Sequence, residues 1–199
     1  MPEQKGGRPR ENSRSKNGIV GQKQTGEMAP PIRQEPGTDQ EWLDQCLEWI
    51  GQQVDRAAIE VAYINPLAKN MPTLVVQRDF YWKVAEVLKK DPRLDFNYLV
   101  ELHGTDYMTH MSVFVFLYSF RHGKSVILKT NLEREHPSVS SLADLWPGAN
   151  WPECEAYDLL GIRFEGHPNL HRIFLGDDWK GHPLRKDYKD ENHDFLSGK

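Results

Sequence analysis

The chain has 199 residues, of which 38% are hydrophobic and six are Trp, enough for one core domain with additional segments. Its charge is divided unevenly, because residues 1–37 hold seven Lys/Arg and four Asp/Glu; they contribute +3, and residues 38–199 contribute −7, to the net charge of −4. An acidic body disfavours nucleic acid as the main ligand, since phosphate binding depends on cationic side chains.

Cysteine usage and hydropathy narrow the possible classes further. The two cysteines are Cys46 and Cys154, and no CxxC pair occurs, so this chain alone builds neither a Cys-ligated iron–sulfur cluster nor a zinc finger. We interpret both as free thiols in a reducing compartment, with a disulfide between them as the open alternative. No apolar run approaches the ~20 residues of a membrane-spanning helix, and the N-terminus has no apolar secretory core. We therefore expect any membrane association to run through partner chains.

Residues 1–37 are predicted to be a disordered N-terminal tail. They contain no Phe, Tyr or Trp and are rich in Gly, Pro, Gln, Ser and charge, so they bury too little apolar area to offset the entropy of ordering. The alternative function, a nucleic-acid-binding arm, is disfavoured because the Lys and Arg residues are scattered.

Residues 38–135 are predicted to form an α+β core domain that begins with a helix. Thr38 and Glu41 have the spacing of a capping box, in which each side chain satisfies a free amide at a helix start. The apolar residues that follow recur at helical spacing and predict one buried stripe. They are Leu43, Cys46, Leu47, Ile50 and Val54.

The rest of this domain is predicted to contain two strands and a second helix before Pro92. Residues 58–64 and 73–77 have the composition of strands, and prolines interrupt the chain between them. Residues 79–90 have the spacing of a helix, which Pro92 ends.

Three more strands are expected after Pro92. Residues 96–103 alternate strictly, which predicts a strand with one buried and one solvent-exposed face. Tyr98 and Val100 are expected on the buried face. Residues 111–120 are apolar on both faces, as in a central strand, and residues 125–130 follow after a short turn. Short connections imply antiparallel pairing with helices on one face. The predicted fold class is therefore α+β: a small antiparallel or mixed sheet with helices on one face, followed by an extended C-terminal docking segment.

Residues 136–199 are predicted to contain short helices and an extended segment that docks on a partner. The serines at 140–141 are expected to cap a short helix that runs to residue 145. Asn150 is expected to cap another helix, which Gly161 ends. No hydrophobic period survives beyond residue 163, which indicates extended, turn-rich chain.

Two Gly-His-Pro triplets occur in this segment, at residues 166–168 and 181–183. They are too close together to be a solenoid repeat. We interpret them as two similar rigid turns, in which Pro fixes the direction of the chain and His supplies one hydrogen bond.

The histidines and cysteine of this segment suggest two kinds of catalytic site. A metal site would draw on residues with ligating side chains, but Pro168 favours extended chain where the helical spacing of two histidines would be needed. These residues are His167, His171, Cys154, Glu153 and Glu155. A nucleophile would be Cys154 in the first turn of a helix, although a structural cysteine is the simpler interpretation.

The acids of this segment are better explained as partners of downstream cations. Glu153 and Glu155 near a helix start interact favourably with its dipole. Glu155 and Asp158 are three apart on one face, where like charges cost free energy unless cations pair with them, and Arg binds a carboxylate in a strong bidentate pair. We predict that carboxylate–guanidinium pairs hold this segment, within the chain or across an interface; a solvated charged face is the alternative. The candidate cations are Arg163, Arg172, Arg185 and Lys186.

The spacing of these residues closely resembles the signature of the 30 kDa subunit family of respiratory complex I, known in bacteria as the C subunit of NADH-quinone oxidoreductase. The matching residues are Glu153, Glu155, Asp158, Gly161, Ile162, Phe164, Gly166, His167, Pro168, Leu170, Arg172 and Ile173, then Asp178, Trp179 and the run 181–188. The resemblance extends over roughly residues 40–190.

The resemblance implies a non-catalytic subunit without a redox centre in the peripheral arm of a proton-translocating enzyme. FMN and iron–sulfur clusters are then expected in partner subunits, NADH and quinone are bound by the complex, and no catalytic, cofactor-binding or metal-binding residue is expected on this chain. The D subunit is the main expected partner, with the B and I subunits as further neighbours. The expected location is the cytoplasmic face of the bacterial plasma membrane, and we expect the version that is not fused to the D subunit.

The resemblance also implies which residues form the partner interface or support it. They are Glu153, Glu155, Asp158, Gly161, His167, Pro168, Arg172, Trp179, His182, Pro183, Arg185, Lys186, Asp187 and Tyr188. This chain departs from the family at two positions, because Cys154 stands where Arg is common and His171 where a cation is usual.

Two other functions are weighed against this one. The first is the equivalent subunit of a related complex with a different electron donor, such as a membrane-bound hydrogenase. The second is a stand-alone Cys- or metal-dependent hydrolase. Purification separates the hydrolase from a complex subunit. A hydrolase would keep its activity when isolated, whereas an isolated subunit would be colourless and would not oxidise NADH.

Overall fold

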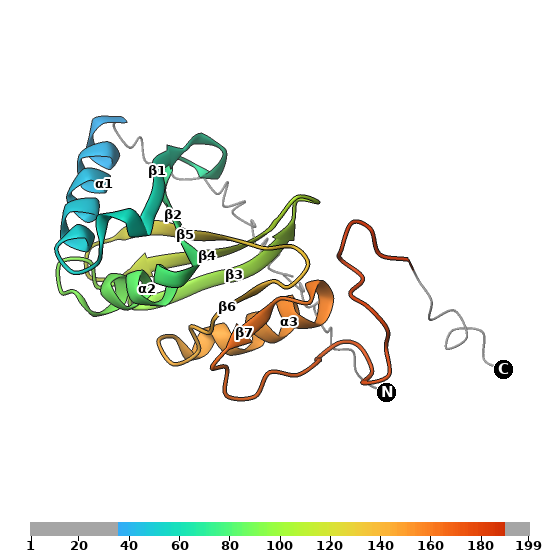
Figure 1. Cartoon of the computed structure of the whole chain (residues 1–199). Coiled ribbons are helices and arrows are strands. Elements are labelled where there is room, and N and C mark those ends of the chain that lie inside the picture. Colours follow the sequence, from blue (N-terminus) through green and yellow to red (C-terminus); the bar gives the residue numbers. More distant parts are fainter. Residues whose placement is uncertain (1–35, 190–199) are drawn as a thin grey trace, which may run out of the picture. The chain divides into compact units, whose positions relative to one another are not determined.

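A five-stranded mixed sheet forms the centre of the computed structural model, which describes residues 36–189 (Figure 1). In spatial order its strands are β1 (Ile59–Asn65), β2 (Met71–Val76), β5 (Lys124–Leu132), β4 (Met111–Ser119) and β3 (Tyr98–Asp106). Neighbouring strands are antiparallel except β2 and β5, which are parallel. The predicted α+β class is thus confirmed. The tail predicted for residues 1–37 lies outside the described residues except for Pro36 and Gly37.

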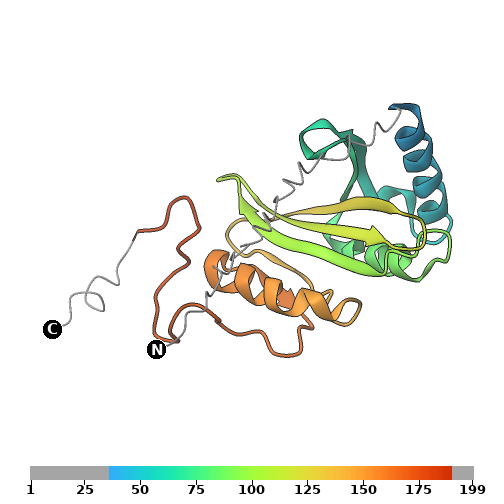
Figure 2. The ribbon, with the colours of Figure 1, turned by 180° about the vertical axis from the view of Figure 1, so that it is seen from behind.

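Three α-helices accompany the sheet: α1 (Pro36–Gly51), α2 (Tyr81–Lys90) and α3 (Asn150–Leu160). Figure 2, seen from behind, shows the strands in front of α2. Single 3-10 turns, η1 to η4, occupy Arg56–Ala58, Pro66–Ala68, Arg78–Phe80 and Pro147–Ala149. None of the helices within residues 36–189 is long and apolar enough to cross a membrane.

The first helix begins earlier than the capping box predicts. It starts at Pro36, two residues before Thr38. Proline suits this position, because the first helical amides have no partner within the helix. The predicted stripe is otherwise confirmed, since Leu43, Cys46 and Ile50 are buried. Burial raises the pKa of the Cys46 thiol to about 12, as for a small core hydrophobe.

The strict alternation predicted for β3 is wrong. Leu99 is buried, whereas Tyr98 and Val100 are about half exposed. Leu99 pairs with Leu117 of β4 and Glu101 pairs with the preceding residue, Phe116, so Val100 is the extra residue of a β-bulge. A bulge changes which face the later residues point to, and periodicity alone does not reveal it.

The apolar strand β4 is central, as predicted, because β3 and β5 flank it on both sides. Val113, Val115 and Leu117 are buried in the main core. On the opposite face, Phe114 and Phe116 are only half buried. The two apolar faces of this strand thus have different environments.

A second, two-stranded parallel sheet pairs β6 (Ser138–Ser140) with β7 (Arg163–Glu165). The helix predicted for residues 140–145 is therefore wrong. The Ser141 hydroxyl accepts the Ala143 amide, which caps a turn, and donates to the Glu153 carboxylate. The predicted cap of α3 is also misplaced by one residue, since Asn150 is the first helical residue and Ala149, at the end of η4, precedes it.

Helix α3 packs on strand β3 through a close approach at Gly104. A Cβ atom on Gly104 would lie 2.7 Å from side-chain carbons of both Leu160 and Ile162. Leu160, Ile162 and Phe164 belong to the same hydrophobic cluster as Leu102. The domain division at residue 135 stays a prediction; both sides of it contribute to one core.

The close approach predicts that Gly104→Ala destabilises the chain. The added methyl group overpacks the contact between β3 and α3, and we expect the free energy of unfolding to fall by about 1–3 kcal/mol in urea titrations. Gly148→Ala is the matched control, because its Cβ meets nothing within 4 Å. Equal effects of the two substitutions would contradict this account.

Candidate functional site

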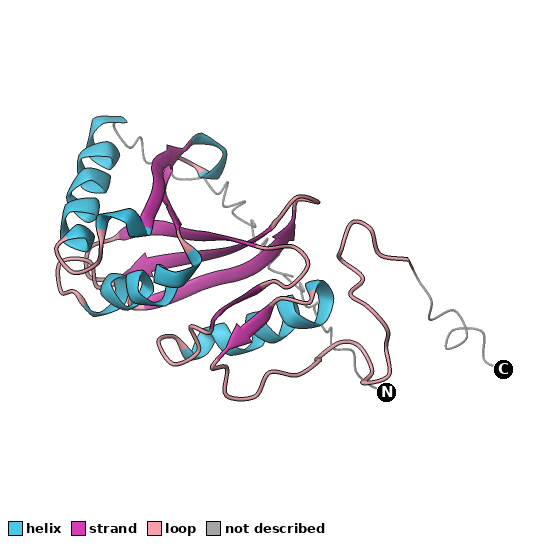
Figure 3. Ribbon diagram, in the orientation of Figure 1, coloured by secondary structure: helices cyan, strands magenta, loops and turns pink. Residues whose placement is uncertain are grey.

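The part of the signature after β7, residues 166–188, is called the signature segment. It runs along α3 without regular secondary structure (Figure 3). Such a segment has few hydrogen bonds within its own backbone, so side chains and neighbouring elements must hold it in place. Its path is set by three groups of contacts, which centre on Asp158, on the last carbonyls of α3 and on Arg134.

Asp158 is the anchor of the segment. Its buried Oδ2 atom accepts the consecutive amides of Ile173, Phe174 and Leu175, at 3.0, 2.8 and 3.1 Å. Its Oδ1 atom accepts Nη1 of Arg172 at 2.8 Å. Burial alone would raise the pKa of this carboxyl, but the amides and the guanidinium outweigh it and hold the pKa below its usual value. The predicted carboxylate–guanidinium pairing is thus confirmed for Asp158 and Arg172, within the chain.

The last carbonyls of α3 are bonded to the same segment. Nδ1 of His182 donates to the Asp158 carbonyl at 2.9 Å, the Leu184 amide to Leu159 at 2.9 Å, and Nε of Arg185 to Leu160 at 2.8 Å. Carbonyls at a helix C-terminus have no partner within the helix and carry partial negative charge, so donors and cations are favoured there.

The two Gly-His-Pro triplets form similar turns at opposite ends of α3. Gly166 and Gly181 have φ angles of 80° and 81°, in the left-handed region. His167 donates from Nε2 to the carbonyl of Asn150, the first residue of α3, at 3.1 Å, and His182 bonds Asp158 near its end. The prediction that each His supplies such a bond is confirmed.

Gly161 ends α3 with a φ of 78°, as predicted for the residue after a helix. It also leaves room for the second turn, because a Cβ atom there would lie 2.7 Å from the His182 ring. Two constraints therefore favour glycine at this position: the left-handed backbone conformation and the close approach of the His182 ring.

Arg134 joins the end of the segment to the sheet. Its guanidinium binds both carboxylate oxygens of Asp106 at 2.9 Å, and both of Asp187 at 2.6 and 3.0 Å. Asp106 also accepts the Lys186 amide at 3.0 Å. Arg134 holds the pKa values of both carboxyls low. Sequence reasoning gave no role to Asp106 and Arg134; a carboxylate at the end of a predicted strand was the available signal.

Glu153 is buried in a different environment. Its carboxylate accepts the Ser141 hydroxyl at 2.6 Å and the Leu142 amide at 2.7 Å, with Nε2 of His167 at 3.9 Å. Burial raises the pKa of Glu153 to about 7, against the lowering effect of these two hydrogen bonds. It thus ties the loop after β6 to α3.

Cys154 lies beside two histidines, as the metal and nucleophile hypotheses required. Its Sγ atom is 3.9 Å from Nε2 of His167 and 4.0 Å from Nδ1 of His171. These nitrogens donate to the Asn150 and Asn169 carbonyls, and the thiol is 1% exposed. No group of three His, Cys, Asp or Glu residues within residues 36–189 is arranged to hold a metal. Cys154, His167 and His171 thus pack together between α3 and the segment that follows β7.

The remaining signature residues lie along the segment. Pro168 and Lys186 are exposed and Trp179, Pro183 and Tyr188 are half buried. Glu155 is exposed on α3. The signature residues thus differ in exposure, although they belong to one sequence motif.

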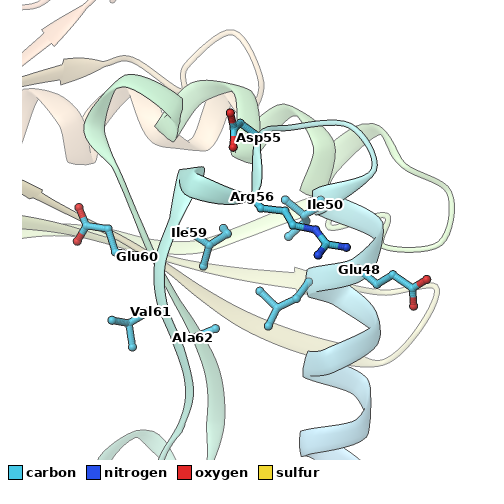
Figure 4. Close-up of a pocket in the computed structure, with 10 residues that line it drawn as sticks. Glu48, Ile50, Asp55, Arg56, Ile59, Glu60, Val61 and Ala62 are labelled. Atoms are coloured by element: carbon cyan, nitrogen blue, oxygen red, sulfur yellow. The ribbon is translucent and has the colours of Figure 1, made fainter.

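A groove of about 440 Å³ lies at the other edge of the sheet, between α1 and β1 (Figure 4). Apolar side chains such as Ile50 and Ile59 line it, with Glu48 and Arg56 among its charged residues. Its lining contains no Cys or His, and none of the signature residues.

The anchor predicts that Asp158→Asn loosens the signature segment. An amide group cannot replace a carboxylate that accepts three amides and a guanidinium, so we expect a loss of about 2–4 kcal/mol in the free energy of unfolding. Limited proteolysis should cut the variant faster within residues 166–188. The exposed Asp177→Asn is the control, and an equal cutting rate in both variants would contradict the assigned role.

The raised pKa of Glu153 predicts a pH-dependent stability. The folded chain keeps a proton that the unfolded chain releases near its ordinary pKa of 4.5, so stability falls as pH rises toward about 7. Glu153→Gln stays neutral, and we expect it to match the wild type at pH 4 and to exceed it by up to about 3 kcal/mol at pH 8. Urea titrations at both pH values measure the difference; a constant offset would refute the assignment.

Comparisons with known proteins give relatives that are named as subunits of NADH-quinone oxidoreductase. The C subunit of NADH-quinone oxidoreductase from Roseiflexus sp. (strain RS-1) is 48% identical over 107 residues, which are 52% of this chain and 62% of that protein. The chain thus spans less than two thirds of that relative. The C subunit from Moorella thermoacetica (strain ATCC 39073 / JCM 9320) is 42% identical over 122 residues, 60% of this chain and 81% of that protein. The C/D subunit from Shigella flexneri serotype 5b (strain 8401) is 37% identical over 149 residues, 70% of this chain and 25% of that protein.

Solved structures and a family model agree with these relatives. A trypsin-resistant fragment of Nqo5 superimposes with a TM-score of 0.53 and 28% identity over 64% of this chain and 98% of the fragment. A chain of the membrane-bound sulfane sulfur reductase, an archaeal respiratory membrane complex, reaches a TM-score of 0.63 at 18% identity, over 81% of this chain and 91% of that one. The family model described as respiratory-chain NADH dehydrogenase, 30 Kd subunit matches residues 74–194. Since that match covers more than half of the sequence, this chain belongs to the 30 Kd subunit family of the respiratory-chain NADH dehydrogenase.

Proposed function

We propose that this chain is a non-catalytic subunit in the peripheral arm of a proton-translocating NADH:quinone oxidoreductase. The observation that carries this proposal is the use of the signature residues. Asp158, Arg172, His182 and Arg185 bond to α3 and the segment itself, as structural residues do. Because the chain belongs to this family, we assign the segment a structural role in an NADH:quinone oxidoreductase.

The D subunit is the main partner in this proposal. The C/D relative carries both letters in the name of one protein, and a fused pair must lie close together. The B and I subunits are proposed as further neighbours. The chain would then sit at the cytoplasmic face of the bacterial plasma membrane, held there by its partners.

The redox groups of the enzyme are assigned to the partners as well. NADH, FMN, the iron–sulfur clusters and quinone would be bound by other subunits of the complex. Cys46 and Cys154 are both buried and far apart in the sequence, and neither lies in the CxxC spacing that clusters commonly use. The signature segment of this chain would contribute position and stability.

A second electron donor is the alternative within this proposal. The fold is shared with a chain of the sulfane sulfur reductase, so this architecture also occurs in a respiratory complex of another name. A related complex such as a membrane-bound hydrogenase would use the same kind of subunit. An assay of the purified complex with each donor decides between them.

Purification of the full chain with an affinity tag from its own cells tests the proposal. We expect solubilised membranes to yield the D subunit and NADH:quinone reductase activity with the tagged chain, whereas the chain expressed alone oxidises no NADH. Cys154→Ala should leave the activity of the complex within about twofold of wild type, because the thiol is a packing group. Reduction of quinone by hydrogen instead of NADH would favour the alternative donor. Hydrolase activity of the isolated chain that Cys154→Ala abolishes would overturn the proposal.

A further inference from the structure

The acids of the signature differ in how their charges are satisfied. Asp158 binds Arg172 and three amides, and Glu153 binds a hydroxyl and an amide in the interior. The carboxylate of Glu155, in contrast, is exposed and accepts no hydrogen bond or ion pair from any residue between 36 and 189. No pair of Glu155 is found within residues 36–189, and a pair across an interface, the other form of the prediction, stays a prediction.

Glu155 stands in the middle of an apolar surface. Trp151 lies one turn before it and Leu159 one turn after it, so the three residues share one stripe of α3. Trp151 is 70% exposed and Leu184, which bonds through its amide to Leu159, is 58% exposed. Glu155, Leu159 and Leu184 line the same small pocket of about 150 Å³, together with Pro152. We call Trp151, Glu155, Leu159 and Leu184 the α3 stripe.

The other sides of α3 are already covered. Ala156 and Leu160 pack on Gly104 of β3, and Cys154 and Asp158 lie beneath the signature segment. Trp151 and Glu155 remain exposed on α3, Leu159 is half buried there, and Leu184 is exposed beside it. Trp is enriched among interface hot spots, because its large ring buries much apolar area on binding.

We propose that the α3 stripe is the surface that contacts the D subunit, and that this partner presents there an apolar surface with one Lys or Arg that pairs with Glu155. The inference rests on the proposed function for the identity of the partner. Charge complementarity argues for the cation, because an apolar partner that covered Glu155 would bury an unpaired carboxylate. Trp151 and Leu184 supply the apolar contact.

Co-expression of the tagged full chain with an untagged D subunit tests this inference. We expect Glu155→Lys and Trp151→Ala each to weaken retention of that partner by about tenfold or more in washes at physiological salt. Glu60→Lys and Phe120→Ala are the matched controls, because both residues are exposed and lie away from α3, on β1 and just after β4. Circular dichroism of each isolated variant checks that the fold is kept, as expected for exposed positions.

The outcomes separate the inference from the proposed function. Retention of the D subunit by the wild type, with undiminished retention by Glu155→Lys and Trp151→Ala, would overturn the inference and leave the proposed function intact. Failure of the wild-type chain to retain this partner would overturn both. Restoration of the Glu155→Lys complex by a Lys→Glu or Arg→Glu change in the partner would identify the paired cation directly.

Discussion

The binding of three consecutive amides by the Asp158 carboxylate is the interaction on which the rest of the signature segment depends. A buried carboxylate is costly unless donors surround it, and here residues 173–175 and Arg172 supply them. The exchange is mutual, because an irregular segment needs acceptors for its amides as much as the carboxylate needs donors. Once this contact forms, the following residues are brought to the end of α3, where His182 and Arg185 find its free carbonyls.

This arrangement separates the paired charges of the signature from the exposed surface of α3. Arg172 pairs with Asp158, and Arg134 is shared between Asp106 and Asp187, so these charged groups already have partners within the chain. A charged pair that is already formed within the chain adds little to the binding free energy of a partner subunit, because its two groups already bond to each other. What remains exposed on α3 is Trp151 with the single carboxylate of Glu155, which combines contact area with one specific charge.

Much of this architecture follows from sequence pattern, and the exceptions have physical causes. The buried stripe of α1 and the apolar strand β4 follow from periodicity, and Gly161 follows from helix-end chemistry. The bulge at Val100 does not, because an inserted residue leaves no mark in the alternation. Nor does the site of Asp106 and Arg134, since a contact between residues 28 apart depends on the path of the whole chain.

The environment of Cys154 shows why the departures from the family pattern matter locally. The family resemblance implies Arg at this position, next to Glu153 in sequence, whereas this chain has a buried thiol there. The groups that bond to Glu153 are a hydroxyl and an amide, and neither is a cation. Burial then acts on Glu153 without a guanidinium to offset it, which accounts for the direction of its pKa shift. Uncharged donors thus hold Glu153, whereas a guanidinium and three amides hold Asp158, five residues on.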